Sequence, residues 1–283
     1  MKEELKKEYL NRLSTPYTRG GKKECFKQQY LHGKGNELTK KFWSLTSSAR
    51  LCFDLYSWMA CDPAYEAIEF EKKLPGIKSG GREIHPDMDV YYEKADGIYF
   101  IESKYTEKIN NKSYKKQLPE AYWNTNETYK NSKGKDTTYP IEKRYHKNSI
   151  VMNAFLHFIE EIESIAKDQK QESWFDAKQE TCHLLGIVLF AIIKKPEKPI
   201  HFLNVAANYC EDPFAEEFRS KAEAMVKDIF SKSSINVSFE YKLTSVKDYF
   251  KKPLSLGQKG YQTEIAIEDL LKDKSRYKVT IPL

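Results

Sequence analysis

Alternating polar and apolar positions in the first half of the chain predict a β-hairpin. Residues 86–92 and 98–104 both alternate with a period of two and are rich in aromatic and β-branched residues, as strands are. Asp96-Gly97 lies between them and predicts a tight turn with left-handed backbone geometry. The apolar content of the second run indicates that its strand is buried.

The rest of the chain alternates between helical and strand-like patterns. An almost wholly apolar run at residues 184–193 is too short to cross a membrane, and its β-branched content predicts a central buried strand. We expect helices at residues 1–13, 47–60, 150–165, 213–230 and 244–250, strands at 67–71, 201–205 and 235–243, and a last helix and strand within 263–281. Ser47 or Ser48 and Asp212 are the expected N-caps of two helices. This alternation predicts one α/β domain spanning residues 1–283.

The composition is that of a globular protein outside the membrane. Hydrophobic residues make up 40% of the 283 positions and charged residues 31%. No apolar run reaches the roughly 18 residues of a membrane span, and the N-terminus has no apolar signal region, so we expect a cytoplasmic protein. Five cysteines without CxxC spacing argue against both a disulfide framework and a zinc site: Cys25, Cys52, Cys61, Cys182 and Cys210.

The net charge of +6 is unevenly distributed along the chain. Residues 1–41 and residues 104–147 each carry eleven Lys and Arg against five Asp and Glu, so the remainder of the chain is acidic. Two basic segments beside an acidic body are typical of a protein that binds nucleic acid. Solvated surface lysines are the alternative interpretation of each segment.

The second basic segment also interleaves aromatic residues with lysines and asparagines. Between residues 105 and 147 lie six tyrosines and one tryptophan. Lysines contact phosphate groups and aromatic rings stack on bases, so this insert favours DNA contact, with Lys112, Lys115 and Lys116 as candidate DNA-binding residues. A partly helical insert whose tyrosines pack on the core is the alternative.

Three residues of the hairpin could carry chemistry. Glu102 and Lys104 are two positions apart, so they project to the same face of the second strand. Asp87 opens the first strand, and pairing would bring it beside them. Two carboxylates form a hard oxygen site for Mg²⁺, and a nearby lysine can orient or deprotonate a water molecule.

These residues resemble those of a nuclease superfamily. Pro86-Asp87, followed after a short hairpin by Glu102-Ser103-Lys104, resembles the PD-(D/E)xK nucleases, most closely their restriction-endonuclease-like members. The segment at residues 47–54 is similar to the opening helix of some stand-alone restriction enzymes. The resemblance implies a restriction-endonuclease-like core, in which helices flank a central mixed β-sheet, with the basic insert as an elaboration.

The resemblance also implies an activity and its site. The chain would be a stand-alone, type II-like restriction endonuclease that hydrolyses phosphodiester bonds in double-stranded DNA, leaving a 5′-phosphate and a 3′-hydroxyl. Asp87, Glu102 and the backbone carbonyl of Ser103 would hold one or two Mg²⁺ ions. Lys104 would position the attacking water and offset charge on the transition state.

Several alternatives stay open on the sequence. Glu69 is a candidate additional acid of the site, and Asp54 and Glu66 are two others. A repair or recombination nuclease would share the same chemistry, a non-catalytic nucleic-acid-binding protein could keep the fold, and an RNA nuclease is compatible with the same residues. The pattern leaves open the recognition sequence and whether the chain forms a homodimer.

Overall fold

The structure is a computed structural model of the whole chain. It describes residues 3–19, 22–32, 38, 41–43, 47–79, 82–104, 108–125, 128–130, 134–169, 172–207 and 209–250. The helix and strand expected within 263–281 lie outside these residues.

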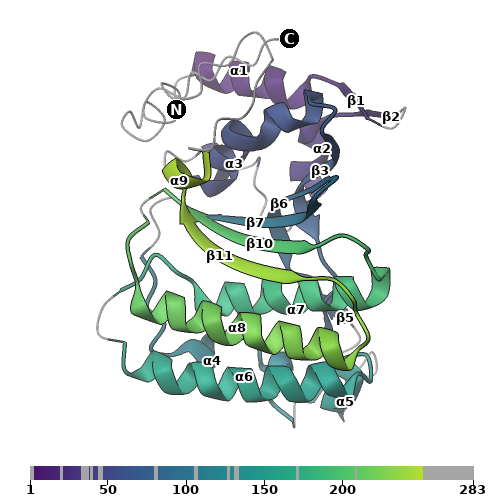
Figure 1. Cartoon of the computed structure of the whole chain (residues 1–283), viewed down its shortest axis with the longest axis vertical. Helices are drawn as coiled ribbons and strands as arrows, with labels where there is room; N and C mark the ends of the chain where they lie inside the picture. Colours follow the sequence, from purple (N-terminus) through teal and green to yellow (C-terminus); the bar gives the residue numbers. More distant parts are fainter. Residues whose placement is uncertain are drawn as a thin grey trace.

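A central five-stranded mixed sheet organises the fold (Figure 1). Its strand order is β11-β10-β7-β6-β3, with bounds Phe239–Ser245, Ile200–Ala206, Gly97–Lys104, Asp87–Lys94 and Tyr65–Lys73. Strands β3, β6 and β7 form an antiparallel meander, and β10 and β11 continue the sheet parallel to β7. The expected α/β class with a mixed sheet flanked by helices is therefore confirmed.

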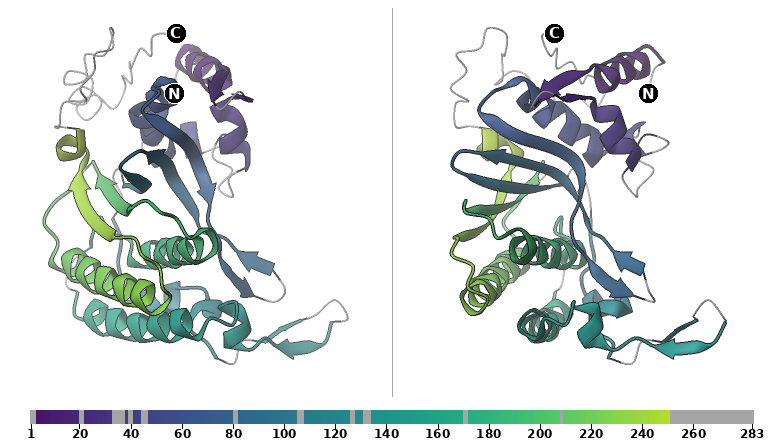
Figure 2. Two further views of the ribbon diagram at one scale, coloured as in Figure 1. Left: turned by 45° about the vertical axis from the view of Figure 1, so that its right-hand side comes forward. Right: turned by 90° about the vertical axis from the view of Figure 1, so that its right-hand side faces the viewer.

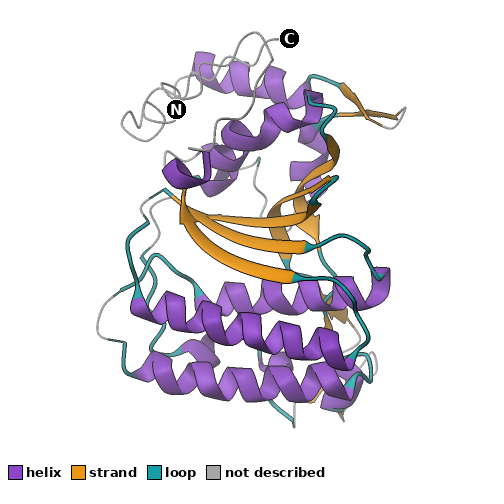
Figure 3. Cartoon of the chain, viewed as in Figure 1, coloured by secondary structure: helices purple, strands orange, loops and turns teal. Residues whose placement is uncertain are grey.

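Helices cover both faces of this sheet (Figure 3). One face carries α1, α2 and α3, at Glu3–Ser14, Phe26–His32 and Ser48–Tyr56, and the other carries α6, α7 and α8, at Ser149–Lys167, Ala177–Lys194 and Pro213–Lys232. Side chains of β7 alternate between the two faces of the sheet. Ile98 and Phe100 pack into the core beneath α6–α8, and Ile101 packs into the core beneath α1–α3.

Shorter helices and two-stranded ribbons surround the central sheet and its helices. The short helices are α4, α5 and α9, at Tyr114–Gln117, Ile141–Arg144 and Val246–Phe250, and the 3₁₀ turns are Lys41–Trp43, Ser57–Cys61 and Glu120–Tyr122. The described residues also form three two-stranded ribbons: β1–β2 at Tyr17–Arg19 and Lys22–Glu24, β4–β5 at Ile77–Ser79 and Arg82–Ile84, and β8–β9 at Thr128–Lys130 and Asp136–Thr138. The β8–β9 ribbon, part of the basic insert, extends away from the body (Figure 2).

The expectation of a strand at residues 184–193 is wrong, because this run lies inside helix α7. The Asp176 side chain caps the helix by accepting a hydrogen bond from the Gln179 N–H, and Lys195 ends it with left-handed backbone angles. The run is apolar on all sides because α7 packs against the sheet, α4 and α8 at once. A segment buried all round has no polar face, so its periodicity cannot distinguish a helix from a strand.

Two helix starts follow local capping signals, whereas the strand expected at 235–243 begins only at Phe239 and continues to Ser245. Ser47 caps α3 and Asp212 caps α8, as expected, through side-chain oxygens that accept backbone N–H groups. The hairpin turn differs from the expectation, because neither Asp96 nor Gly97 has a positive φ. Gly97 instead gives room to a neighbour, since a Cβ there would lie 2.7 Å from the His201 ring.

None of the helices in the described part of the chain is both long and apolar enough to cross a membrane.

Candidate functional site

The site lies where strands β6 and β7 separate. Their ladder ends at the pair Val90 and Ile101, so the last residues of β7 have no partner on β6. The backbone N–H of Ser103 donates instead to the Asp89 carboxylate, over 2.8 Å. Because the N–H and C=O of one strand residue point to the same edge, the Ser103 carbonyl faces the same gap. The gap therefore opens beside the Glu-Ser-Lys segment of the hairpin.

Glu102 and Lys104 form a buried ion pair on the α7 side of the sheet. The Lys104 Nζ lies 2.8 Å from Glu102 Oε1 and 2.5 Å from the Gln179 side-chain oxygen on α7. The two residues are only 1% and 5% exposed. A surface Glu–Lys pair would be solvated, so this burial separates the pair from an ordinary exposed hairpin.

The charge state of Lys104 follows from the groups around it. Burial alone lowers the pKa of a lysine, but the carboxylates of Glu102, Glu180 and Asp176 outweigh burial and raise the Lys104 pKa well above its usual value. Lys104 is therefore an ammonium group at neutral pH. It can orient a bound oxygen and offset negative charge, and in this state it has no lone pair with which to act as a base.

Helix α7 contributes a second buried carboxyl group, that of Glu180. Its two oxygens accept hydrogen bonds of 2.7 Å each, one from the Asn204 side chain on β10 and one from the Tyr241 hydroxyl on β11. Burial first, and then the nearby charge of Glu102, raise the Glu180 pKa well above its usual value. Side chains of β10 and β11 thus hold the buried carboxyl group of this α7 residue in place. Its ionisation is energetically unfavourable unless a positive charge lies nearby.

His183, one turn further along α7, lies between the two hairpin strands. Its Nε2 is 3.1 Å from the backbone carbonyl of Asp87, and its Nδ1 is 3.4 Å from Glu102 Oε2. Burial, and then the charge of Lys104, lower the His183 pKa to about 3, so the ring is neutral at physiological pH. The ring thereby brings the start of β6 and the end of β7 to one point.

The residues at this point fit a divalent cation. Glu102, Glu180 and His183 each offer a ligand atom, and these atoms lie within 4.8 Å of one another. The backbone carbonyl of Asp87, at the start of β6, lies beside the His183 ring, whereas the Asp87 carboxylate is not one of these clustered ligand atoms. The Ser103 carbonyl faces the adjoining gap between β6 and β7. Carboxylate and carbonyl oxygens are ligands that Mg²⁺ accepts, and an imidazole nitrogen widens the choice to transition metals.

Two of the candidate additional acids make ion pairs elsewhere. Glu69 pairs with Lys72 on its own strand, with 2.5 Å between the charged atoms. Glu66 pairs with Lys198, at 2.6 Å. Both partner lysines are half-buried. The acid that lies beside Glu102 among the described residues is Glu180 of α7, which is none of the three candidates.

The third candidate, Asp54, is buried in the layer of α1–α3. Its carboxylate lies 3.0 Å from an Arg12 nitrogen and accepts a 2.5 Å hydrogen bond from the Tyr9 hydroxyl. Burial, only partly offset by Arg12 and Tyr9, raises the Asp54 pKa to about 6. This network joins α1 to α3, on the other side of the sheet from Glu102.

The basic insert is divided between core and surface. Tyr114, Tyr122 and Tyr145 are at most 1% exposed and join the core under α6–α8, so these three rings cannot stack on bases as expected. Among the three candidate DNA-binding lysines, Lys112 and Lys116 are exposed. Lys115 is engaged instead, because its ammonium group pairs with Glu160 and lies 5.0 Å from the Trp123 ring centre.

Sequence reasoning missed the contribution of α7. Gln179, Glu180 and His183 face the site because residues three and four apart share one side of a helix. The i, i+3 spacing of Glu180 and His183 was the available signal, and it is visible only if residues 177–194 are taken as a helix.

No protein-family model matches this chain, and no curated protein or solved structure matches it either.

Proposed function

We propose that this protein is a Mg²⁺-dependent DNA endonuclease with a restriction-endonuclease-like fold, acting as a type II-like restriction enzyme. The observation that carries the proposal is the Glu102–Lys104 ion pair, buried at the end of the central strand β7. Burying two charges is costly unless they are paired, and replacing them with apolar residues would often be neutral or stabilising for the fold. A chemical role accounts for keeping them there.

The strand order supports the fold assignment. The antiparallel meander β3–β6–β7 leads through α7 into β10, which pairs parallel to β7. This arrangement places Asp87 at the start of β6 and Glu102 near the end of its neighbour, at the same edge. The Pro-Asp and Glu-Ser-Lys segments of the PD-(D/E)xK pattern are thereby close in space as well as in sequence.

Each residue has a distinct part in the proposed reaction. Asp87, Glu102 and the Ser103 carbonyl would hold the metal ion, with Glu180 as a further acid from α7. A bound Mg²⁺ polarises the scissile phosphate and lowers the pKa of a water molecule. Lys104, kept cationic by the surrounding carboxylates, orients the attacking water and offsets charge on the pentacovalent transition state.

Asp89 is two positions from Asp87 and is the main competitor for its role. Its carboxylate accepts the Ser103 N–H, which has no backbone partner on β6 because the ladder between the two strands ends at Val90 and Ile101. Asp89 therefore has a structural task in the gap. We expect Asp87→Asn to abolish cleavage and Asp89→Asn to retain measurable activity. The reverse result would transfer the metal-binding role to Asp89.

The test is digestion of several long double-stranded DNAs with and without Mg²⁺. Discrete bands that need Mg²⁺ support a restriction enzyme, whereas a smear indicates a nonspecific or structure-directed nuclease. Glu102→Gln should abolish cleavage, and Glu240→Gln, an exposed change of the same kind on β11, should not. Absence of cleavage under all conditions, with DNA binding retained, would replace the proposal by a non-catalytic DNA-binding role. Cleavage of RNA alone would make the protein an RNA nuclease.

A further inference from the structure

The hydrogen bond of His183 fixes which ring nitrogen carries the proton. Its Nε2 lies 3.1 Å from the Asp87 carbonyl, and a carbonyl oxygen can only accept, so Nε2 is the protonated nitrogen. In the neutral ring Nδ1 then presents a lone pair. That atom is buried, makes no hydrogen bond to any described residue, and points at Glu102 Oε2, another acceptor, 3.4 Å away. Two buried acceptors that face each other repel unless a proton or a metal cation lies between them.

The surroundings of these atoms are those of supported metal ligands. Histidines that bind metals usually donate their other ring N–H to a carbonyl or carboxylate, which fixes the tautomer, and the Asp87 carbonyl does this here. The Glu180 carboxyl is oriented in the same way by the Asn204 amide and the Tyr241 hydroxyl. Such partners hold a ligand at its place before the ion arrives.

The burial of the two acids also favours a cation. Glu102 and Glu180 are at most 1% exposed, and the Lys104 ammonium contacts Glu102. The Glu180 carboxyl is held by neutral donors, the Asn204 amide and the Tyr241 hydroxyl. A divalent cation between the two acids would offset the charge that a buried Glu180 carries once it is ionised.

We infer that Glu102, Glu180 and His183 form an inner cation site that takes a first-row transition-metal ion of the Mn²⁺ class in preference to Mg²⁺. Two carboxylates suit Mg²⁺ and Mn²⁺ alike, but an imidazole nitrogen favours the transition metal. The ligand atoms lie within 4.8 Å of one another, and opposite ligands of such an ion are about 4.2 Å apart, so a small side-chain rotation closes the site. The inference rests on the proposed function in treating Glu102 as a metal ligand.

The test measures metal binding alone, on the full-length protein freed of metal with a chelator. Mn²⁺ is titrated and free Mn²⁺ is followed by electron paramagnetic resonance, with Mg²⁺ as competitor. Electron spin-echo envelope modulation then reports whether a ¹⁴N nucleus is bound directly to Mn²⁺. We expect ¹⁴N modulation in the wild type, its loss in His183→Gln, and a fall in Mn²⁺ affinity of at least about tenfold in that variant.

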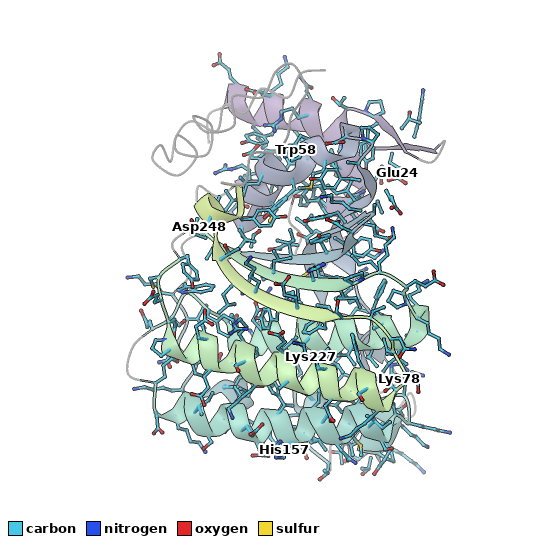
Figure 4. All side chains as sticks on the ribbon, viewed as in Figure 1. Glu24, Trp58, Lys78, His157, Lys227 and Asp248 are labelled. Atoms are coloured by element: carbon cyan, nitrogen blue, oxygen red, sulfur yellow. The ribbon has the colours of Figure 1, made fainter. Side chains whose placement is uncertain are left out.

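The matched control is His157→Gln on α6. His157 is an exposed histidine, with 76% of its side chain accessible, and is labelled in Figure 4 far from β7. It should keep both the affinity and the modulation. If His183→Gln fails to fold, labelling wild-type protein with ¹⁵N-histidine replaces it, because the modulation must then shift from the ¹⁴N to the ¹⁵N frequency.

Each outcome bears on one proposal. Mn²⁺ bound without a histidine nitrogen, an affinity for Mn²⁺ no greater than for Mg²⁺, or no binding at millimolar Mn²⁺ would overturn the inner site. Cleavage of DNA with Mg²⁺ in a protein that fails this test would leave the nuclease proposal standing. A protein with the ¹⁴N coupling that never cleaves DNA would keep the inner site and lose the nuclease proposal.

Discussion

Removing a single oxygen atom tests how Glu180 is held. Tyr241→Phe deletes the hydroxyl that donates to Glu180 Oε2 over 2.7 Å, and leaves the ring stacked on Phe202 with centroids 4.6 Å apart. Tyr241 is 2% exposed, so water cannot easily take the place of the hydroxyl. The carboxylate oxygen would lose one of its donors without any change in packing volume.

The expected cost follows from leaving a buried acceptor without its donor. Removing one partner so that a buried polar group is unsatisfied costs about 1–3 kcal/mol. Urea unfolding in a chelator, followed by fluorescence, measures this directly. With a denaturant slope of about 3 kcal/mol per molar, we expect the midpoint to fall by about 0.3–1 M.

The matched control is Tyr209→Phe, a half-buried tyrosine whose ring packs on Trp174. Its loss of a hydroxyl should change stability by less than about 0.5 kcal/mol. If Tyr241→Phe unfolds at the same urea concentration as this control, the hydrogen bond from Tyr241 to the Glu180 carboxyl does not contribute to stability. The description of Glu180 as an acid held in place by β11 would then be wrong.

Three further changes test other parts of the molecule. Replacing Lys112 and Lys116 with Ala should flatten the plot of log K for DNA against log salt by about one to two units, at roughly 0.9 per phosphate contact, as measured by fluorescence anisotropy; an unchanged slope would make both lysines plain surface. Asp54→Ala leaves the guanidinium of Arg12 unpaired and should lower the free energy of unfolding by about 3–5 kcal/mol in urea, and a loss below 1 kcal/mol would contradict this. Gly76→Ala places a methyl group 1.7 Å from a carbonyl oxygen of β5 and should cost at least about 1–3 kcal/mol, visible as a clear drop in the melting temperature; an unchanged temperature would refute the close approach.

The sequence alone determined the features that depend on near neighbours in the chain. Period-two alternation located both hairpin strands and put Glu102 and Lys104 on one face. Helical spacing together with Ser47 and Asp212 as caps located α3 and α8. Side-chain direction and helix capping depend only on residues a few positions apart in the chain. These patterns can therefore be recognised without knowledge of the fold.

Only the tertiary structure decided what surrounds those elements. The apolar run at residues 184–193 is part of helix α7, which packs against the sheet and two further helices. Residues 184–191 are buried and show no period that identifies the element, although Ile193 at the end of the run is exposed. Glu180 and His183 meet Glu102 only because that helix packs across the end of β7. Periodicity in the sequence shows which side of a helix or strand is apolar. Packing of the elements decides which charged groups from distant segments meet in the buried interior.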